Sequence, residues 1–137
     1  MPDKRLDWDD FYLGIAEAYS KRASCPRAQC GAIIVSKEDN RFLSAGYNGS
    51  PAREPHCLED GCLMEDGHCQ RAIHAECNAV THAAKHGVHL ENAKIYIYGR
   101  RANGQAIEVC RECKKILDAV GIKDIIQRNF KCQECTD

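Results

Sequence analysis

Long apolar runs are missing from this sequence of 137 residues. No stretch approaches the roughly 20 apolar residues that a membrane-spanning helix needs. The first residues, Met1–Arg5, are not followed by the apolar segment of a secretory signal peptide. These absences argue against a membrane partner and predict a cytoplasmic protein.

An excess of one charge is also missing, because 19 basic residues nearly balance 20 acidic residues and leave a net charge of −1. Domains that grip long nucleic acids by charge are usually strongly basic, so we expect no long nucleic acid as a partner. One phosphate could still be bound by a local cluster of Arg and Lys. Repeats and low-complexity segments are absent, and the composition fits one globular domain over residues 1–137.

Cysteine, by contrast, is abundant, with ten residues. In a reducing compartment such cysteines are more often thiols and metal ligands than disulfides. A secreted disulfide scaffold is the alternative. The missing signal peptide and the long helical segments disfavour it.

Hydrophobic spacing predicts alternating helices and strands, with Asp7 as the N-cap of the first helix. The expected helices cover about 8–23, 74–86 and 110–119, and the expected strands cover 31–36, 41–47, 94–98 and 122–127. Residues 52–72 and 100–108 are expected connections, and a short tail follows at about 129–137. This alternation predicts an α/β sandwich with a mixed or parallel sheet.

Candidate metal ligands lie at the starts of the last two expected helices. His74 begins one of them, and Cys110 and Cys113 begin the other. Positions i and i+3 share a helix face, so both sulfurs can reach one ion. Three protein ligands leave the fourth position of a tetrahedral zinc open, as a catalytic zinc requires. Two converging helix N-termini should also lower the pKa of both thiols and keep them as thiolates.

Glu76, two residues after His74, supplies a carboxylate that need not bind the metal. In the first turn of a helix both side chains can line one pocket, where a carboxylate can take a proton from water and pass it on. Zinc deaminases that act on nucleobases share this pattern. The alternatives are half of a structural zinc knuckle for Cys110 and Cys113, and an ordinary helix start for His74–Glu76.

Roughly residues 8–127 resemble the cytidine/deoxycytidylate deaminase superfamily, most specifically its deoxycytidylate (dCMP) deaminase branch. The likeness rests on Ser24–Arg27 before Gly31–Val35, Gly46–Gly49 with Pro51, His56–Cys57, and Arg71–Ala79. The resemblance implies a three-layer α/β/α sandwich around a mixed sheet, as in cytidine deaminases, and a zinc-dependent hydrolase.

The implied reaction is deamination at C4 of a pyrimidine nucleotide, most specifically of dCMP and water to dUMP and ammonia. Zinc held by His74, Cys110 and Cys113 would supply hydroxide. Glu76 would accept the water proton, protonate N3 of the ring and help the amino group to leave.

The same resemblance implies four substrate-binding residues. Asn48 is similar to the sugar-contacting Asn of the family, since its amide can both donate and accept hydrogen bonds. Ala75 is a further implied contact, and Ser24 and Arg27 are candidates for the 5′-phosphate. The alternatives are a turn residue for Asn48 and a solvated surface charge for Arg27.

The second half of the metal motif departs from the family pattern. Val109 stands where the family usually has Pro, and residues 99–105 form a longer stretch than the short loop expected there. That loop borders the active site in the family, so Arg100 or Arg101 could add a phosphate contact. The chain stops soon after the fourth expected strand, so we expect a sheet that is one strand short or an edge covered by a neighbour. Family members commonly form dimers or hexamers, which implies a homo-oligomer.

The spare cysteines suggest a second, structural zinc. Its candidate ligands are Cys57, Cys62 and Cys69 in the long connection and Cys132 and Cys135 in the tail. A closed site of this kind would stabilise a segment that has no core of its own. The alternative is unpaired buried thiols, which is the role expected for Cys30 and Cys77.

Two rival functions are left open by the sequence. A deaminase of cytidine, guanine or a tRNA adenosine would share the zinc motif, although the near-neutral charge disfavours tRNA and the segments around Asn48 and Ser24–Arg27 favour a nucleotide. A non-catalytic zinc-binding module would account for the cysteines but would leave Glu76 without a role.

Overall fold

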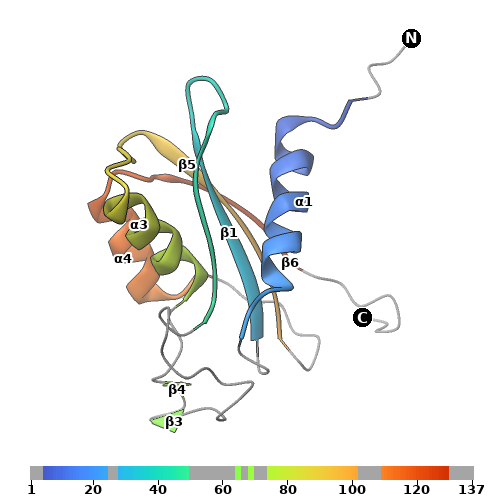
Figure 1. Cartoon of the computed structure of the whole chain (residues 1–137), viewed down its shortest axis with the longest axis vertical. Helices are drawn as coiled ribbons and strands as arrows, with labels where there is room; N and C mark the ends of the chain where they lie inside the picture. The colour runs from blue at the N-terminus through green and yellow to red at the C-terminus, as the bar shows by residue number, and fades with distance from the viewer. Residues whose placement is uncertain are drawn as a thin grey trace.

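The computed structural model describes residues 5–24, 28–49, 74–101 and 109–127, together with the backbone of 64–65, 68–69 and 128–129. These residues form three layers (Figure 1). Helix α1 (Trp8–Ser20) covers one face of the main sheet. Helices α3 (Ala75–Lys85) and α4 (Arg111–Ala119) lie side by side on the opposite face.

The main sheet is mixed and has four strands within the described residues, in the order β2-β1-β5-β6. The strands are β1 (Ala28–Ser36), β2 (Phe42–Tyr47), β5 (Ala93–Arg101) and β6 (Asp124–Asn129). Strand β1 is antiparallel to β2 and β5, whereas β6 is parallel to β5. The predicted three-layer sandwich around a mixed sheet is confirmed. A separate antiparallel pair, β3 (Met64–Glu65) and β4 (His68–Cys69), was not expected from the sequence.

The pleat of the central strands divides the core into two halves. In β1, Ile33 and Val35 pack toward α1, whereas Ala32 and Ile34 pack toward α3 and α4. Strand β5 alternates in the same way. A strand that is buried on both faces needs apolar residues at every position, which explains the continuous apolar run in β1.

Several element boundaries differ from the sequence prediction, and β6 lies two residues later than expected. Helix α1 ends at Ser20 rather than near Ala23, because the next three N–H groups donate to carbonyls only three residues back and so form tight turns. Strands β1 and β5 are longer than expected because their ends pair with each other, Ala28 opposite Arg101. Arg100 and Arg101, which the sequence placed in a polar connection, are therefore strand residues.

Gly46 brings helix α3 directly onto strand β2. A Cβ at this position would lie 2.6 Å from the amide nitrogen of Ala79 and 2.7 Å from the carbonyl oxygen of Ala75. Two hydrogen bonds join the same elements: Ser44 Oγ donates to the Ala79 carbonyl at 2.7 Å, and Asn78 Nδ2 donates to the Tyr47 carbonyl at 2.8 Å. The first turn of α3 is thus fixed beside the end of β2.

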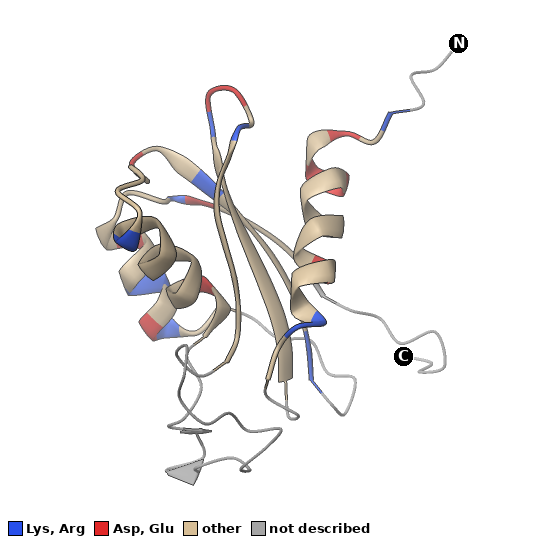
Figure 2. Ribbon diagram, viewed as in Figure 1, with Lys and Arg blue, Asp and Glu red and all other residues tan. Residues whose placement is uncertain are grey.

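Charges of both signs share the same elements (Figure 2). The turn between β1 and β2 carries Lys37 beside Glu38, and in α4 the ammonium of Lys115 lies 3.6 Å from the carboxylate of Glu112. Within the part of the chain that the structure describes, no helix combines the length and apolarity that crossing a membrane requires.

Candidate active site

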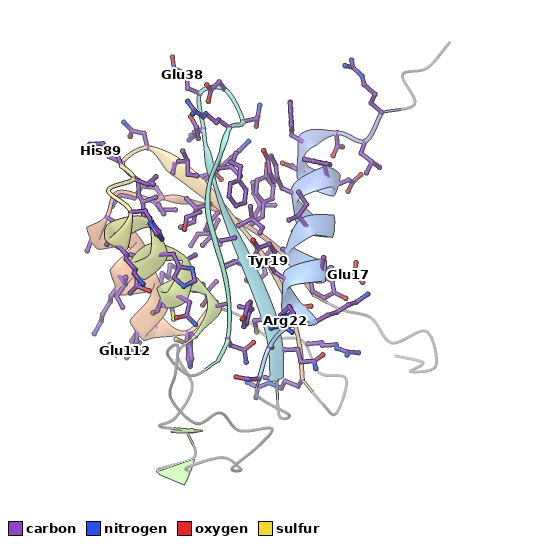
Figure 3. All side chains as sticks on the ribbon, viewed as in Figure 1. Glu17, Tyr19, Arg22, Glu38, His89 and Glu112 are labelled. Atoms are coloured by element: carbon purple, nitrogen blue, oxygen red, sulfur yellow. The ribbon has the colours of Figure 1, made fainter. Side chains whose placement is uncertain are left out.

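The candidate metal ligands come from two helix starts. His74 is the N-cap of α3 and Cys110 is the N-cap of α4, and both have extended backbone. Cys113 lies in the first turn of α4, next to Glu112, which Figure 3 labels. The sulfur of Cys110 accepts a hydrogen bond from the Cys113 amide at 3.4 Å, so it also caps its helix.

These three side chains converge on one point. Nδ1 of His74 lies 3.2 Å from Sγ of Cys110 and 3.3 Å from Sγ of Cys113, and the three ligand atoms all lie within 4.8 Å of one another. In a tetrahedral zinc site, nitrogen and sulfur ligands are roughly 3.6 Å apart. The observed separations are slightly shorter, so small side-chain shifts would accommodate the ion. One nitrogen and two sulfurs form the donor set of a catalytic zinc that leaves a position for water.

The pKa of the Cys113 thiol is shifted in the opposite direction from the one that the sequence predicts. The Cys113 side chain is 1% exposed, and burial together with the negative charge of Glu76 raises its pKa. The prediction of a lowered pKa is therefore wrong for Cys113 in the metal-free protein, because burial and the charge of Glu76 raise that pKa. A metal ion that binds there must displace a proton from this thiol.

Glu76 is a buried carboxylate in the first turn of α3, with 6% of its surface exposed. Among the described residues its oxygens have no hydrogen-bond or ion-pair partner. Burying an unpartnered carboxylate is costly, so such a group usually meets a ligand, an ion or water. Glu76 lies in the first turn of α3, two residues after His74, and its negative charge contributes to the raised pKa of Cys113.

Two of the four predicted substrate residues adjoin each other. The backbone N–H of Ser24 donates to the carbonyl of Asn48 at 3.2 Å, and both residues are buried. The side chain of Asn48 accepts from the N–H of Cys30 at 2.7 Å and donates to the carbonyl of Ala28 at 2.8 Å. Half of its hydrogen-bonding capacity is thus committed to β1, and within the described residues one N–H and one lone pair have no further partner. This arrangement combines the turn role with capacity for a ligand.

The structure places only some of the other residues that were predicted to contact the substrate. Ala75 is fully buried beneath Gly46, whereas Arg27 lies outside the described residues. Arg100, a candidate phosphate contact, donates from Nε and Nη2 to the side-chain oxygen of Gln29, at 2.9 and 2.6 Å. Arg101 is exposed at the end of β5.

The departure from the family pattern before Cys110 is partly explained by packing. Val109, at the position where Pro was expected, is half-buried and packs against the core between the sheet and α3. Of the long stretch at 99–105, residues Gly99–Arg101 are strand and the rest lies outside the described part of the chain.

The spare cysteines separate into three groups. Cys57, Cys62, Cys132 and Cys135 lie outside the described residues, and Cys69 is described only as backbone in β4. Cys30 is a buried core residue, as predicted. The core prediction for Cys77 is wrong, because its half-buried sulfur lies 3.4 Å from the sulfur of Cys113 and belongs to the site. The spacing was a missed signal, since Cys77 follows His74 at i+3, as Cys113 follows Cys110.

A protein-family comparison shows to which family the chain belongs. The family model for the cytidine and deoxycytidylate deaminase zinc-binding region matches residues 6–128. The chain belongs to this family. All three candidate metal ligands and Glu76 fall inside the matched region of the deaminase model.

Individual relatives extend over most of the chain. ComE operon protein 2 of Bacillus subtilis (strain 168) is 38% identical over 122 residues, covering 89% of this chain but only 59% of that protein. The deoxycytidylate deaminase of Mycobacterium phage D29 is 31% identical over 133 residues, covering 89% of this chain and 94% of that protein. The solved structure of dCMP deaminase from the cyanophage S-TIM5, in complex with dCMP and dUMP, matches with a TM-score of 0.72 and 26% identity over 93% of this chain and 85% of that one.

Proposed function

We propose that the chain is a zinc-dependent hydrolytic deaminase that converts dCMP and water to dUMP and ammonia. The observation that carries this proposal is the convergence of His74, Cys110 and Cys113 beside the buried carboxylate of Glu76. The substrate is suggested by the phage D29 relative, which is named a deoxycytidylate deaminase, and by the S-TIM5 enzyme, which was solved with dCMP and dUMP.

Glu76 is the proposed proton carrier of this reaction. When bound, zinc supplies a Lewis acid that makes water acidic enough to act as a nucleophile near neutral pH. The Glu76 carboxylate accepts the proton of that water, delivers it to N3 of the pyrimidine and assists departure of the amino group. Because the carboxylate is buried, its interactions with a bound ring are less screened by solvent than at the surface.

Substrate positioning is assigned to the segment that follows β2. Asn48 would use its second N–H and second lone pair for the sugar, and Ala75 lies against Gly46 at the contact of β2 with α3. Ser24, which is bonded to the backbone of Asn48, and Arg27 are the proposed phosphate contacts. A nucleotide would therefore lie between the start of α3 and the ends of α1 and β2.

An ammonia-release screen tests the proposed function. The zinc-loaded chain is assayed with dCMP, CMP, dCTP, cytidine, guanine and adenosine. We expect dCMP to give the highest kcat/KM, and cytidine to be poor because it lacks the phosphate. A preference for cytidine, guanine or adenosine would replace the dCMP assignment, and ammonia release from none of them would favour the non-catalytic zinc module.

Further properties are proposed on the family resemblance. We propose that residues 1–137 act as one cytoplasmic domain, that it assembles as a homo-oligomer, and that a second, structural zinc uses some of Cys57, Cys62, Cys69, Cys132 and Cys135. Metal analysis and light scattering test the last two. One zinc per chain rejects the second site, and a monomeric mass rejects the oligomer.

A further inference from the structure

Cys77 is a thiol in contact with a metal ligand, and neither the sequence motif nor the proposed reaction gives it a role. It lies in the first turn of α3, one helical turn after His74. Its sulfur is 3.4 Å from the sulfur of Cys113 in the first turn of α4. The contact therefore bridges the two helices at the point where the metal ligands converge.

The geometry favours a supporting role for Cys77 over that of a fourth ligand. The group of ligand atoms that all lie within 4.8 Å of one another contains His74, Cys110 and Cys113 but not Cys77. Either sulfur could donate in the Cys77–Cys113 contact of the metal-free protein. A sulfur that binds zinc is a thiolate and has no hydrogen, so in the metal-bound protein only the S–H of Cys77 can donate.

We propose that Cys77 is a positioning residue of the metal centre, which donates its S–H hydrogen to the Cys113 sulfur and holds that ligand against helix α3. This inference rests on the proposed zinc site. A hydrogen bond to a charged acceptor is stronger than a neutral one. It also ties a ligand carried by α4 to the first turn of α3. Groups that orient metal ligands in this way typically contribute 10–100-fold to metal affinity or activity.

The test measures zinc affinity in the full chain and in three variants at position 77. Cys77→Ala removes the donor, Cys77→Val removes it while filling the space, and Cys77→Ser retains a donor. We expect Ala and Val to bind zinc roughly 10-fold more weakly in competition with a colorimetric chelator. Ser should lie closer to wild type. Melting temperatures of the metal-free variants serve as the folding control.

Cobalt substitution separates a hydrogen-bond donor from a ligand, because the intensity of the sulfur-to-cobalt charge-transfer band follows the number of bound thiolates. We expect a two-thiolate spectrum both in wild type and in Cys77→Ala. A three-thiolate spectrum in wild type that falls to two in Cys77→Ala would overturn the proposal, as would unchanged zinc affinity in both Ala and Val. A wild-type chain that binds no zinc would reject the proposed function itself, and this inference with it.

Discussion

At the scale of single residues, Glu76 combines burial with the absence of a hydrogen-bond partner in the described structure. Replacing it with Gln keeps the shape of the side chain but removes the group that accepts a proton. We expect Glu76→Gln to lower kcat for dCMP by about 10²–10⁴-fold. Zinc content should stay at the wild-type level, because Glu76 is not a ligand. Ammonia release and metal analysis check the two statements, and a variant with normal turnover would refute the mechanism.

Tyr96 gives a prediction for stability at alkaline pH. Its ring is fully buried and its hydroxyl donates to Asp9 at 2.8 Å; burial, followed by this hydrogen bond, raises its pKa above the ordinary 10.0. The folded state favours the neutral form of Tyr96. The stabilisation of the fold by this pKa shift is therefore fully present below about pH 10 and is lost as the pH rises further. Tyr96→Phe should therefore cost about 1 kcal/mol near neutral pH. When the pH is raised from about 8 to about 11, the free energy of unfolding should fall less in Tyr96→Phe than in wild type.

Urea midpoints at the two pH values measure this difference. Tyr12 and Tyr98 also have raised pKa values and are unchanged in the variant, so part of the alkaline loss should persist. An equal loss in the variant and in wild type would show that Tyr96 does not govern this behaviour.

Residues were predictable from the sequence where their chemistry is local. His74, Cys110 and Cys113 could be grouped because three ligands of suitable types at helix starts match the needs of one ion. Cys77 was misread because it lies outside the zinc-deaminase motif, and its contact with Cys113 depends on how the two helices pack against each other. The raised pKa of Cys113 was missed for the same reason, since burial is a property of the assembled fold.

At the scale of elements, helix ends followed their local signals more closely than strand ends did. Asp7 caps α1 through a hydrogen bond from the Asp10 amide at 2.7 Å, and Gly87 and Gly121 adopt the positive φ that ends a helix. Strand ends depend on the partner strand instead. The extension of β5 to Arg101 follows from its pairing with Ala28, which no local pattern encodes.

The contact between β2 and α3 is tested by Gly46→Ala. The added methyl would lie 2.6 Å from backbone of α3, so the helix must move away from the strand. We expect a loss of about 1–3 kcal/mol in the free energy of unfolding. We also expect reduced kcat/KM for dCMP, because the same helix start carries His74 and Glu76. Denaturant unfolding and ammonia release measure the two effects.

Gly14→Ala is the matched control. Gly14 lies in α1 on the opposite face of the sheet and is exposed, and a methyl group added there would meet no heavy atom within 4 Å. The same chemical change should stabilise this helix by about 0.5–1 kcal/mol and leave turnover unaltered. If Gly46→Ala behaved like Gly14→Ala, the close approach of α3 to β2 would not be a constraint.

At the scale of the whole molecule, the proposed metal joins elements that are distant in the sequence. Its ligands come from α3 and α4, and strand β5 lies between these helices in the chain. The unfolded chain does not hold the three ligands together, so binding to the folded state stabilises the fold. The stabilisation is about 2.7 kcal/mol when free zinc is 100 times its Kd.

Zinc removal should therefore lower the melting temperature. For a chain of this size we expect a fall of roughly 10 °C when a chelator removes the ion, and recovery when zinc is added back. Cys110→Ser is the control, since it removes a ligand at the half-buried N-cap of α4 and leaves the buried Cys113 in place. Its melting temperature should be low and nearly insensitive to the chelator. Equal sensitivity of Cys110→Ser and wild type would mean that the stabilising ion is bound elsewhere, which would redirect attention to the spare cysteines.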